Sequence, residues 1–419
     1  MTDEMVRETR SYCRNCRAWV PARLIERGGN VDLDSDCPAC GARSRVFKFN
    51  SAFYRAIGAF DDHAAPKPLP DTVDGKVNEL YLDVVGRCNL TCSICFAGSG
   101  THIASDDPPL DRYLDVLRRI RGPKPILSVL GGEPTLRADL PDFIAEVTRM
   151  GFHVKLDTNG IRLADENYLD ELVRAGLRTV CLQFDGFDRD AYRAIRGADL
   201  LDLKARVLDA LVRRDLNIIL ACMIVPGVND HQTVPILDYA LRTPQVSLIG
   251  YLPAANIGRN DVGGEPRRFD LHDFVAFLEG QTGGAIGERD FVRSMRLARL
   301  MGRLTGSSDF HVTSCFVGTY VARKSGRFAP VTRLMDPAGF WRAREFAGLL
   351  PQAWSVARGR RRCVRRPGIL GVVVETYLDH DNLEWVSAHQ CPKAYVTPDG
   401  LRAVCLYNAT LRERPSTPD

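Results

Sequence analysis

The chain of 419 residues lacks several features that would place it in a common class of protein. It has no apolar run of roughly 18 residues or more and no basic start followed by an apolar stretch, so we expect neither a membrane-spanning helix nor a secretory signal. Its 56 Lys and Arg residues nearly balance 52 Asp and Glu residues, and the net charge of +4 points neither to nucleic acid nor to a polybasic membrane anchor. Low-complexity segments and internal repeats are also missing. These absences predict a soluble cytoplasmic protein with length for about two or three domains.

Cysteine, in contrast, is plentiful, with 13 in the chain. Many of them are grouped closely, in two C-x2-C pairs and one triplet. In a cytoplasmic protein such groups indicate metal ligation in a reducing compartment, because disulfides are rare there.

The two pairs lie near the N-terminus and are separated by twenty residues. Their members are Cys13, Cys16, Cys37 and Cys40. Each pair turns tightly enough to aim both sulfurs at one ion, and Gly41 permits the backbone turn of a metal knuckle. Four sulfurs accept zinc or a single iron, so we predict mononuclear Zn or Fe. A segment this short cannot build an adequate core, so the ion stabilises residues 1–60 as a knuckle domain, with electron transfer as the alternative role. The proline-rich stretch 61–77 is predicted to be a linker.

The triplet follows an apolar run, 80–85, which is typical of a strand. Its members, in the spacing C-x3-C-x2-C, are Cys88, Cys92 and Cys95. Three thiolates on one short loop can hold three irons of a [4Fe–4S] cube and leave the fourth iron open for another ligand. An odd number of cysteines at a strand end is a poor disulfide framework, which leaves three incidental core cysteines as the alternative.

From residue 78 to 255, short apolar runs alternate with helical patterns. The predicted strands are 79–86, 125–130, 152–157, 178–184, 217–225 and 245–252, and the predicted helices are 110–121, 139–150, 165–175, 201–214 and 232–242. Such alternation predicts an α/β fold with a parallel sheet and helices outside. Ligands of such folds lie at the carboxyl ends of the strands. There, after the second strand, stand Gly131, Gly132 and Glu133, where glycines permit close backbone approach and a carboxylate can accept from an ammonium group.

The cysteine loop and the Gly-Gly-Glu run together resemble the radical S-adenosylmethionine (SAM) superfamily. In that superfamily the open iron chelates SAM, and one electron splits SAM into methionine and a 5′-deoxyadenosyl radical. The resemblance implies a partial (β/α)6 barrel, a [4Fe–4S] cluster on the loop, and a SAM amino group held by Gly131, Gly132 and Glu133. It also implies an electron donor of the flavodoxin or ferredoxin type.

In relatives, the ends of the third and fourth strands line the SAM ribose and the substrate cavity. The resemblance therefore makes Asn159 and Asp185 candidate cofactor-binding residues, with a helix cap or turn as the alternative. Arg196 can reach the SAM carboxylate as a bidentate donor, unless it faces solvent. Asn229, after the fifth strand, is expected to cap the next helix.

Four widely separated cysteines stand in the C-terminal third: Cys315, Cys363, Cys391 and Cys405. A Pro-Asp-Gly turn at 398–400 predicts a hairpin whose arms bring Cys391 and Cys405 together. We therefore predict an auxiliary [4Fe–4S] cluster in a domain of residues 256–419, with unrelated buried thiols as the alternative. Two further cysteines, Cys181 and Cys222, lie among apolar residues and are expected to be small core side chains.

The whole layout, including the motifs LGGEPT, LQFDG and PGVND, resembles one branch of the superfamily. This branch contains the archaeal tetraether-lipid synthases and the enzymes that methylate the pterin ring of methanopterin. It implies hydrogen abstraction from an unactivated carbon and C–C bond formation, by coupling of alkyl chains or by methylation of a pterin-like ring. Near Cys391 the branch has a further Cys and a His where this chain has Pro392 and Ala394. The substrate and the number of auxiliary clusters of that branch therefore cannot be assigned to this chain.

Other interpretations remain open. A radical SAM maturase or natural-product tailoring enzyme would oxidise or cyclise its substrate. A non-SAM iron–sulfur electron carrier would explain the cysteines but not the Gly-Gly-Glu run, and a zinc-ribbon nucleic-acid-binding protein would explain the N-terminal pairs alone. The basic run Arg358–Arg366 is usually a solvated face, but it can also receive a phosphate-bearing substrate or contact a membrane surface. We expect a small-molecule or lipid substrate and no nucleic-acid partner.

Overall fold

The computed structural model describes residues 3–59, 77–100, 107–261, 269–305, 314–324, 326–334, 368–379, 381–389 and 391–411. The predicted linker lies almost wholly outside this part of the chain, as do Cys363 and the basic run. Among the residues described, no helix has both the length and the apolar character needed to cross a membrane.

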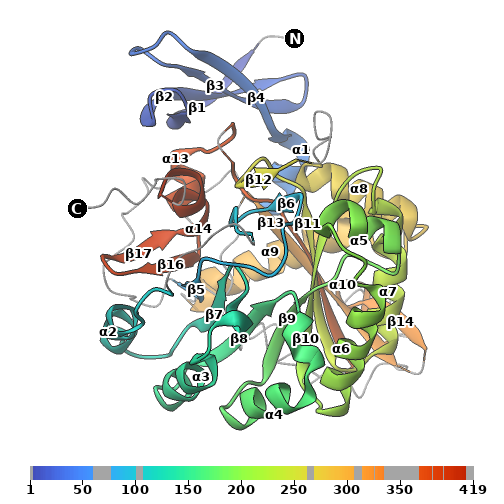
Figure 1. Cartoon of the computed structure of the whole chain (residues 1–419). Coiled ribbons are helices and arrows are strands. Elements are labelled where there is room, and N and C mark those ends of the chain that lie inside the picture. The colour runs from blue at the N-terminus through green and yellow to red at the C-terminus, as the bar shows by residue number, and fades with distance from the viewer. Residues whose placement is uncertain are drawn as a thin grey trace.

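The N-terminal segment forms a four-stranded antiparallel sheet in chain order, drawn in blue at the top of Figure 1. Its strands are β1 (Glu4–Cys13), β2 (Ala18–Arg27), β3 (Asn30–Asp36) and β4 (Arg43–Asn50). Alternation along the strands puts Leu24, Val31 and Leu33 on one buried face. The sheet leads into α1 (Ser51–Ile57), where Asn50 accepts a hydrogen bond from the Phe53 N–H at 3.0 Å and caps the helix.

The centre of the molecule is a run of six parallel strands that lie side by side in chain order. They are β5 (Glu79–Val85), β7 (Ile126–Gly131), β8 (His153–Thr158), β9 (Thr179–Gln183), β10 (Asn217–Ile224) and β11 (Val246–Pro253). The six predicted strands are thus confirmed to within one residue at each end. All five predicted helices are present as well, as α2 (Asp111–Arg119), α3 (Leu140–Arg149), α4 (Glu166–Arg174), α6 (Leu201–Arg213) and α7 (Thr233–Arg242). The mixed α/β class follows directly from this alternation.

One helix between these strands was not predicted, α5 (Arg189–Arg196). It is only eight residues long, although its apolar side chains recur at helical spacing. Asp188 caps it by accepting from the Asp190 N–H at 2.8 Å, and Tyr192 and Ile195 are buried on its inner face. The amphipathic spacing was therefore present in the sequence, but over too short a segment to be recognised.

The C-terminal third extends the central strands on both sides, giving a sheet of eleven strands (Figure 1). Beyond β11 come β15 (Ile369–Glu375), β13 (Phe316–Lys324) and β14 (Arg327–Pro330); beyond β5 come β16 (Lys393–Thr397) and β17 (Gly400–Ala403). The predicted hairpin at residues 398–400 is confirmed, since β16 and β17 pair antiparallel across it. Each outermost strand has one neighbour among the described strands, so the sheet is open there. The remaining elements are β6 (Ile94–Cys95), β12 (Arg259–Asn260), α8 (Leu271–Gln281), α9 (Glu288–Thr305), α10 (Val331–Leu334), α13 (Trp385–His389) and α14 (Val404–Leu406).

The two faces of this sheet differ in chemistry. Leu82, Val129 and Leu156 point to the large apolar core beneath the helices. Because side chains alternate along a strand, the residues between them point to the opposite, inner face. Tyr81 and Lys155 lie there. The inner face and the carboxyl ends of the strands are where the site is built.

Candidate active site

The four N-terminal cysteines converge on one point. Their sulfurs all lie within 4.8 Å of one another, with Cys13 and Cys40 at 3.7 Å and Cys16 and Cys37 at 3.6 Å. The backbone N–H of Cys40 lowers the pKa of Cys37 to about 6, whereas the Cys40 thiol and its neighbours raise the pKa of Cys16 to about 12. One thiolate therefore forms readily at the centre of three further thiols. This donor set fits a single tetrahedral Zn or Fe ion, as predicted.

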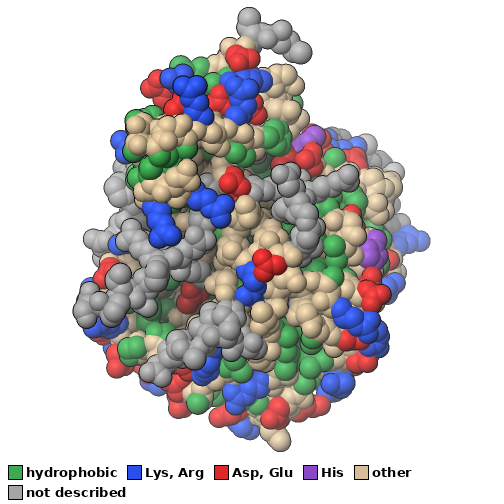
Figure 2. All heavy atoms as spheres, turned by 45° about the horizontal axis from the view of Figure 1, so that its top comes forward, with side chains coloured by type: hydrophobic (Ala, Val, Ile, Leu, Met, Phe, Trp, Pro, Cys, Tyr) green, Lys and Arg blue, Asp and Glu red, His purple; other side chains and the backbone are tan. Residues whose placement is uncertain are grey.

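The surface around this knuckle carries both signs of charge. Arg27 pairs with Asp34 at 2.7 Å, and Arg45 pairs with the same carboxylate at 3.3 Å. Figure 2 shows basic and acidic side chains interspersed over this lobe. A nucleic-acid site uses a patch of one sign, so this surface does not favour the nucleic-acid-binding alternative.

The cysteine triplet lies on the loop that follows β5, at the carboxyl end of the strand. Cys92 is buried, and Cys88 and Cys95 are half-buried. Leu90 donates its N–H to Cys88 Sγ at 3.4 Å, and Arg259 Nε donates to the Cys92 carbonyl at 2.6 Å. Burial raises the pKa of Cys88 to about 12, so a thiolate here requires a positively charged partner such as iron. Unlike the knuckle sulfurs, these three do not all lie within 4.8 Å of one another in the described structure, which suits a cluster of several irons better than one ion.

Gly131 and Gly132 are required by the close approach of this loop. A Cβ at Gly131, where φ is +138°, would lie 2.2 Å from the Val85 carbonyl oxygen. A Cβ at Gly132 would lie 2.1 Å from the carbonyl oxygen of Arg87. The backbone N–H of Gly132 instead donates to Val85 at 2.8 Å, and that of Glu133 donates to Arg87 at 3.0 Å. The Gly-Gly-Glu run is thus hydrogen-bonded directly to the start of the cysteine loop.

Glu133 is 1% exposed and joins the carboxyl ends of β7 and β8. Its carboxylate accepts hydrogen bonds from the Thr135 hydroxyl at 2.5 Å, the Thr158 hydroxyl at 2.7 Å and the Asn159 N–H at 2.8 Å. Sequence reasoning missed both threonines: the Thr135 contact is a local one made two residues after Glu133, whereas the Thr158 contact depends on the neighbouring strand β8. The role of Glu133 as ligand of the SAM amino group stays a prediction.

Asn159 links the end of β8 to the cysteine loop. Its side-chain amide donates to Asn89 Oδ1 at 2.7 Å and lies 3.9 Å from Cys88 Sγ. Its own side-chain oxygen accepts from the Ile161 N–H at 3.0 Å. The predicted cofactor-binding residue therefore lies beside the first cysteine of the triplet, where it positions the loop.

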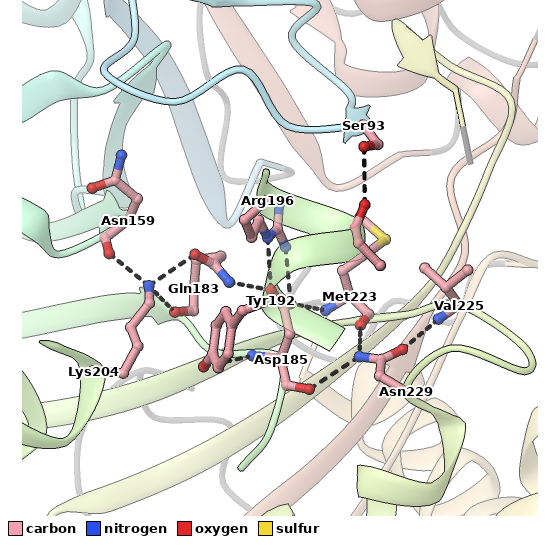
Figure 3. A network of polar contacts seen from close by, with 11 residues as sticks. Ser93, Asn159, Gln183, Asp185, Tyr192, Arg196, Lys204, Met223, Val225 and Asn229 are labelled. Carbon is pink, nitrogen blue, oxygen red and sulfur yellow. Dashed lines mark hydrogen bonds and ion pairs between the residues drawn. The ribbon is translucent and has the colours of Figure 1, made fainter. Parts of the chain in front are cut away.

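Asp185 and Arg196 form a buried bidentate ion pair, shown in Figure 3. Arg196 Nε and Nη2 donate to the two carboxylate oxygens at 2.6 and 2.9 Å, and Asp185 is 0% exposed. Burial lowers the pKa of Arg196, but Asp185 and then the nearby Cys92 thiol raise it above its ordinary value. Asp185 and Arg196, both predicted to bind the cofactor, thus lie together beside Cys92 of the triplet. Asp185 fixes the guanidinium, and contact of Arg196 with the SAM carboxylate stays a prediction.

Two residues of the same network were missed or misjudged. Lys204, fully buried, donates to the carbonyl oxygens of Asn159 and Gln183, both at 2.6 Å, and burial lowers its pKa to about 7 (Figure 3). Its position within an ordinary helical pattern gave no signal. Asn229 was expected to cap a helix, but its side chain makes no cap hydrogen bond. It instead donates to the Asp185 carbonyl at 3.1 Å and to the Met223 carbonyl at 2.7 Å, joining the ends of β9 and β10.

Three of the four C-terminal cysteines lie near one another. The segment after β15 joins them: the Thr376 N–H donates to the Cys315 carbonyl at 2.8 Å, the Leu378 N–H donates to Cys405 Sγ at 3.4 Å, and Cys391 and Cys405 each pack in a cluster that includes Tyr377. Cys391 packs in the same cluster as Phe96, the residue that follows the cysteine triplet. This group is therefore adjacent to the cysteine loop. As expected, Cys181 and Cys222 are buried core residues.

Comparison with known proteins agrees with this geometry. Residues 82–240 match the Radical SAM superfamily, and residues 5–47 match the HMPTM N-terminal zinc ribbon domain. A 7,8-dihydro-6-hydroxymethylpterin dimethyltransferase from Methanocaldococcus jannaschii is 32% identical over 367 residues, covering 80% of this chain and 72% of that protein. The chain belongs to the radical SAM superfamily.

Two other proteins match shorter parts of the chain. A GTP 3′,8-cyclase from Corynebacterium glutamicum is 29% identical over 232 residues, covering 52% of this chain and 61% of that protein. The crystal structure of Streptococcus suis SuiB bound to S-adenosylmethionine superimposes with a TM-score of 0.42 at 16% identity, covering 50% of this chain and 47% of that one. Membership of the superfamily implies a [4Fe–4S] cluster and SAM, for which the cysteine loop supplies the three thiols.

Proposed function

We propose that this radical SAM enzyme methylates a pterin-like ring by forming a C–C bond. One observation carries the proposal: the similarity to the pterin dimethyltransferase extends over 80% of the chain, well beyond the residues that match the superfamily as a whole. The alternative of lipid coupling has no comparable support among the described residues. Oxidation or cyclisation by a maturase-type enzyme is the second alternative.

When bound, the cluster and SAM would supply a 5′-deoxyadenosyl radical, which can remove hydrogen from a carbon that acid–base chemistry does not activate. The resulting carbon radical would take its new carbon from a methyl donor such as a second SAM, with one further electron from the reductant. Cys88, Cys92 and Cys95 would hold the cluster. Glu133, fixed by its threonine partners, orients the amino end of SAM, and Arg196, fixed by Asp185, orients its carboxylate. The inner face of the sheet would receive the substrate below this loop.

We also propose that Cys315, Cys391 and Cys405 hold an auxiliary [4Fe–4S] cluster. Their common contact with the segment 376–378 supports this site, and Cys363 lies outside the described residues. An auxiliary cluster beside the cysteine loop would serve as an electron conduit or hold a reaction intermediate. A flavodoxin- or ferredoxin-type donor supplies the electron, and the substrate is a small molecule.

The test is an anaerobic assay of the reconstituted full chain with SAM, a strong reductant and 7,8-dihydro-6-hydroxymethylpterin. We expect 5′-deoxyadenosine together with a pterin product that has gained one or two methyl groups, detected by mass spectrometry. The variant Cys88→Ala serves as the inactive control. Formation of 5′-deoxyadenosine with an unmethylated pterin, or coupling of alkyl chains when a phospholipid replaces the pterin, would contradict the proposal.

A further inference from the structure

The inner face of the sheet carries a belt of charged side chains to which the proposed reaction has so far given no role. Lys155 Nζ and the Ser128 hydroxyl donate to the same Glu79 oxygen at 2.5 and 2.6 Å. On the neighbouring side, Lys393 Nζ donates to both oxygens of Glu375 at 2.7 Å. Burial would raise the pKa of Glu79, but Lys155 and Lys393 lower it to about 2. The two glutamates are therefore engaged by the two lysines of the belt.

Asp157 is the carboxylate of this face that is not engaged in this way. Its Oδ1 lies 3.4 Å from Lys155 Nζ, whereas its Oδ2 is buried on the side of the Cys181 thiol and has no other hydrogen-bond partner among the described residues. The side chain remains 28% exposed. Burial raises its pKa to about 6, which shows that its charge is poorly compensated. A ligand that donates hydrogen bonds would satisfy this carboxylate.

The position of Asp157 in the barrel points toward the reacting centre. It stands at the carboxyl end of β8, two residues before Asn159, whose amide lies 3.9 Å from Cys88 Sγ. Two residues of a strand span roughly 7 Å. A flat ring held by Asp157 would thus lie on the wall that leads up to the cysteine loop.

An aromatic cluster lies on the same inner face, and the ring centroid of its member Tyr81 lies 5.6 Å from Lys155 Nζ. Tyr81, whose ionisation is influenced by Asp157, meets Tyr395 edge to face at 5.5 Å, and Tyr395 lies 4.3 Å from Tyr407. Phe96, on the cysteine loop, and Tyr377 have parallel rings with centroids 6.0 Å apart. All five belong to one cluster of packed residues. A heteroaromatic ring is the ligand that matches a carboxylate beside such a cluster, because it offers N–H donors at its edge and apolar faces.

We propose that Asp157 is a specificity-determining residue that binds the amino-pyrimidinone edge of the substrate. This edge presents a ring N–H and an exocyclic amine side by side, and both can donate to the exposed side of the Asp157 carboxylate. Pterin and guanine share the edge. The assignment of pterin rests on the proposed function, whereas recognition of the edge rests on Asp157 and its surroundings.

The experiment measures binding of 6-hydroxymethylpterin, which is fluorescent, to the reconstituted full chain with SAM present. We expect Asp157→Asn to weaken binding roughly tenfold to hundredfold, the range for a lost charge-assisted hydrogen bond. An analogue without the exocyclic amine should bind the wild type more weakly by a similar factor and should hardly distinguish the wild type from Asp157→Asn. The matched control is Asp238→Asn, an exposed residue of α7, which should bind the pterin like the wild type.

Equal pterin affinity of the wild type and Asp157→Asn overturns the inference, as does a variant that loses SAM binding but keeps pterin binding. If Asp157→Asn does not fold, the analogue still tests the edge on the wild type, where equal affinity for both ligands would overturn it. A wild type that binds guanosine in an Asp157-dependent manner, but neither binds nor methylates the pterin, would overturn the proposed function and keep the inference. A wild type that binds neither ligand overturns both.

Discussion

The two cysteine groups that are recognisable from spacing differ in how their sulfurs are arranged. The four knuckle sulfurs converge within 4.8 Å, because two short turns at strand ends aim them at one point. The three loop sulfurs do not converge in this way. Their positions depend instead on the close backbone contacts and hydrogen bonds between the start of the loop and the run that begins at Gly131 and Gly132. A single ion needs its donors at one centre, whereas a cluster spreads its irons. The difference shows that one site is built by local turns and the other by tertiary packing.

Their electrostatic surroundings differ as well. Two buried basic side chains lie near the cysteine loop. The charge of Arg196 is neutralised by its ion pair with Asp185. Lys204, in contrast, donates only to uncharged oxygens of Asn159 and Gln183 among the described residues. The knuckle is packed against small apolar residues, including Val20 and Ala42. The following predictions would break or sharpen this contrast.

The largest expected effect is at the knuckle. We expect Cys37→Ser to release the ion and unfold residues 4–50, since structural zinc contributes on the order of 10–16 kcal/mol to such domains. Metal analysis and limited proteolysis would measure both changes. Arg14→Ala, an exposed change within the first C-x2-C turn, is the control and should retain the ion. A folded, protease-resistant Cys37→Ser sheet without metal would show that the ion is not structural.

A smaller effect is expected where the knuckle sheet meets the body of the molecule. Glu384 is fully buried and accepts from Arg7 on β1 at 3.0 Å. Burial would raise the pKa of Glu384, but Lys48 and Arg7 lower it to about 2. A lowered folded-state pKa stabilises the protein above the unfolded pKa of about 4.5, and this stability is lost as the pH falls from 4.5 toward 2.

We therefore expect Glu384→Gln to reduce the free energy of unfolding at neutral pH by on the order of 3 kcal/mol. The loss should shrink as the pH falls below 4.5. Denaturant unfolding at several pH values measures it. A difference between wild type and variant that stays constant with pH would contradict this account of the junction.

The smallest change in stability is expected at the cysteine loop. Gly132→Ala forces a methyl group against the Arg87 carbonyl, and such overpacking costs roughly 1–3 kcal/mol. The added methyl group displaces the backbone of the cysteine loop itself. We therefore expect a large drop in the rate of SAM cleavage even where the melting temperature falls only slightly. Gly280→Ala in α8, where an added Cβ meets nothing within 4 Å, should leave the rate unchanged. Equal rates for the two variants would mean that this backbone contact does not position the loop.

The sequence predicted what is local and missed what is assembled across strands. The strands, most helices and both cysteine groups follow from spacing and periodicity, which act over a few residues. The contact of Thr158 with Glu133 and the placement of Lys204 depend on packing between different elements of the chain, which no local pattern records. The same reason explains why β15 and β16 were not expected to flank the central strands: their neighbours, β11 and β5, lie far away in sequence.

The most direct test of the account compares three reconstituted proteins anaerobically: the wild type, Cys88→Ala and Cys222→Ala, the last removing a buried cysteine of the core. After reduction and addition of SAM, 5′-deoxyadenosine is measured together with iron, sulfide and the knuckle metal. We predict 5′-deoxyadenosine from the wild type and Cys222→Ala and none from Cys88→Ala, with the knuckle metal retained in all three. Undiminished 5′-deoxyadenosine from Cys88→Ala would contradict the assignment of the cysteine loop as the SAM-cleaving site.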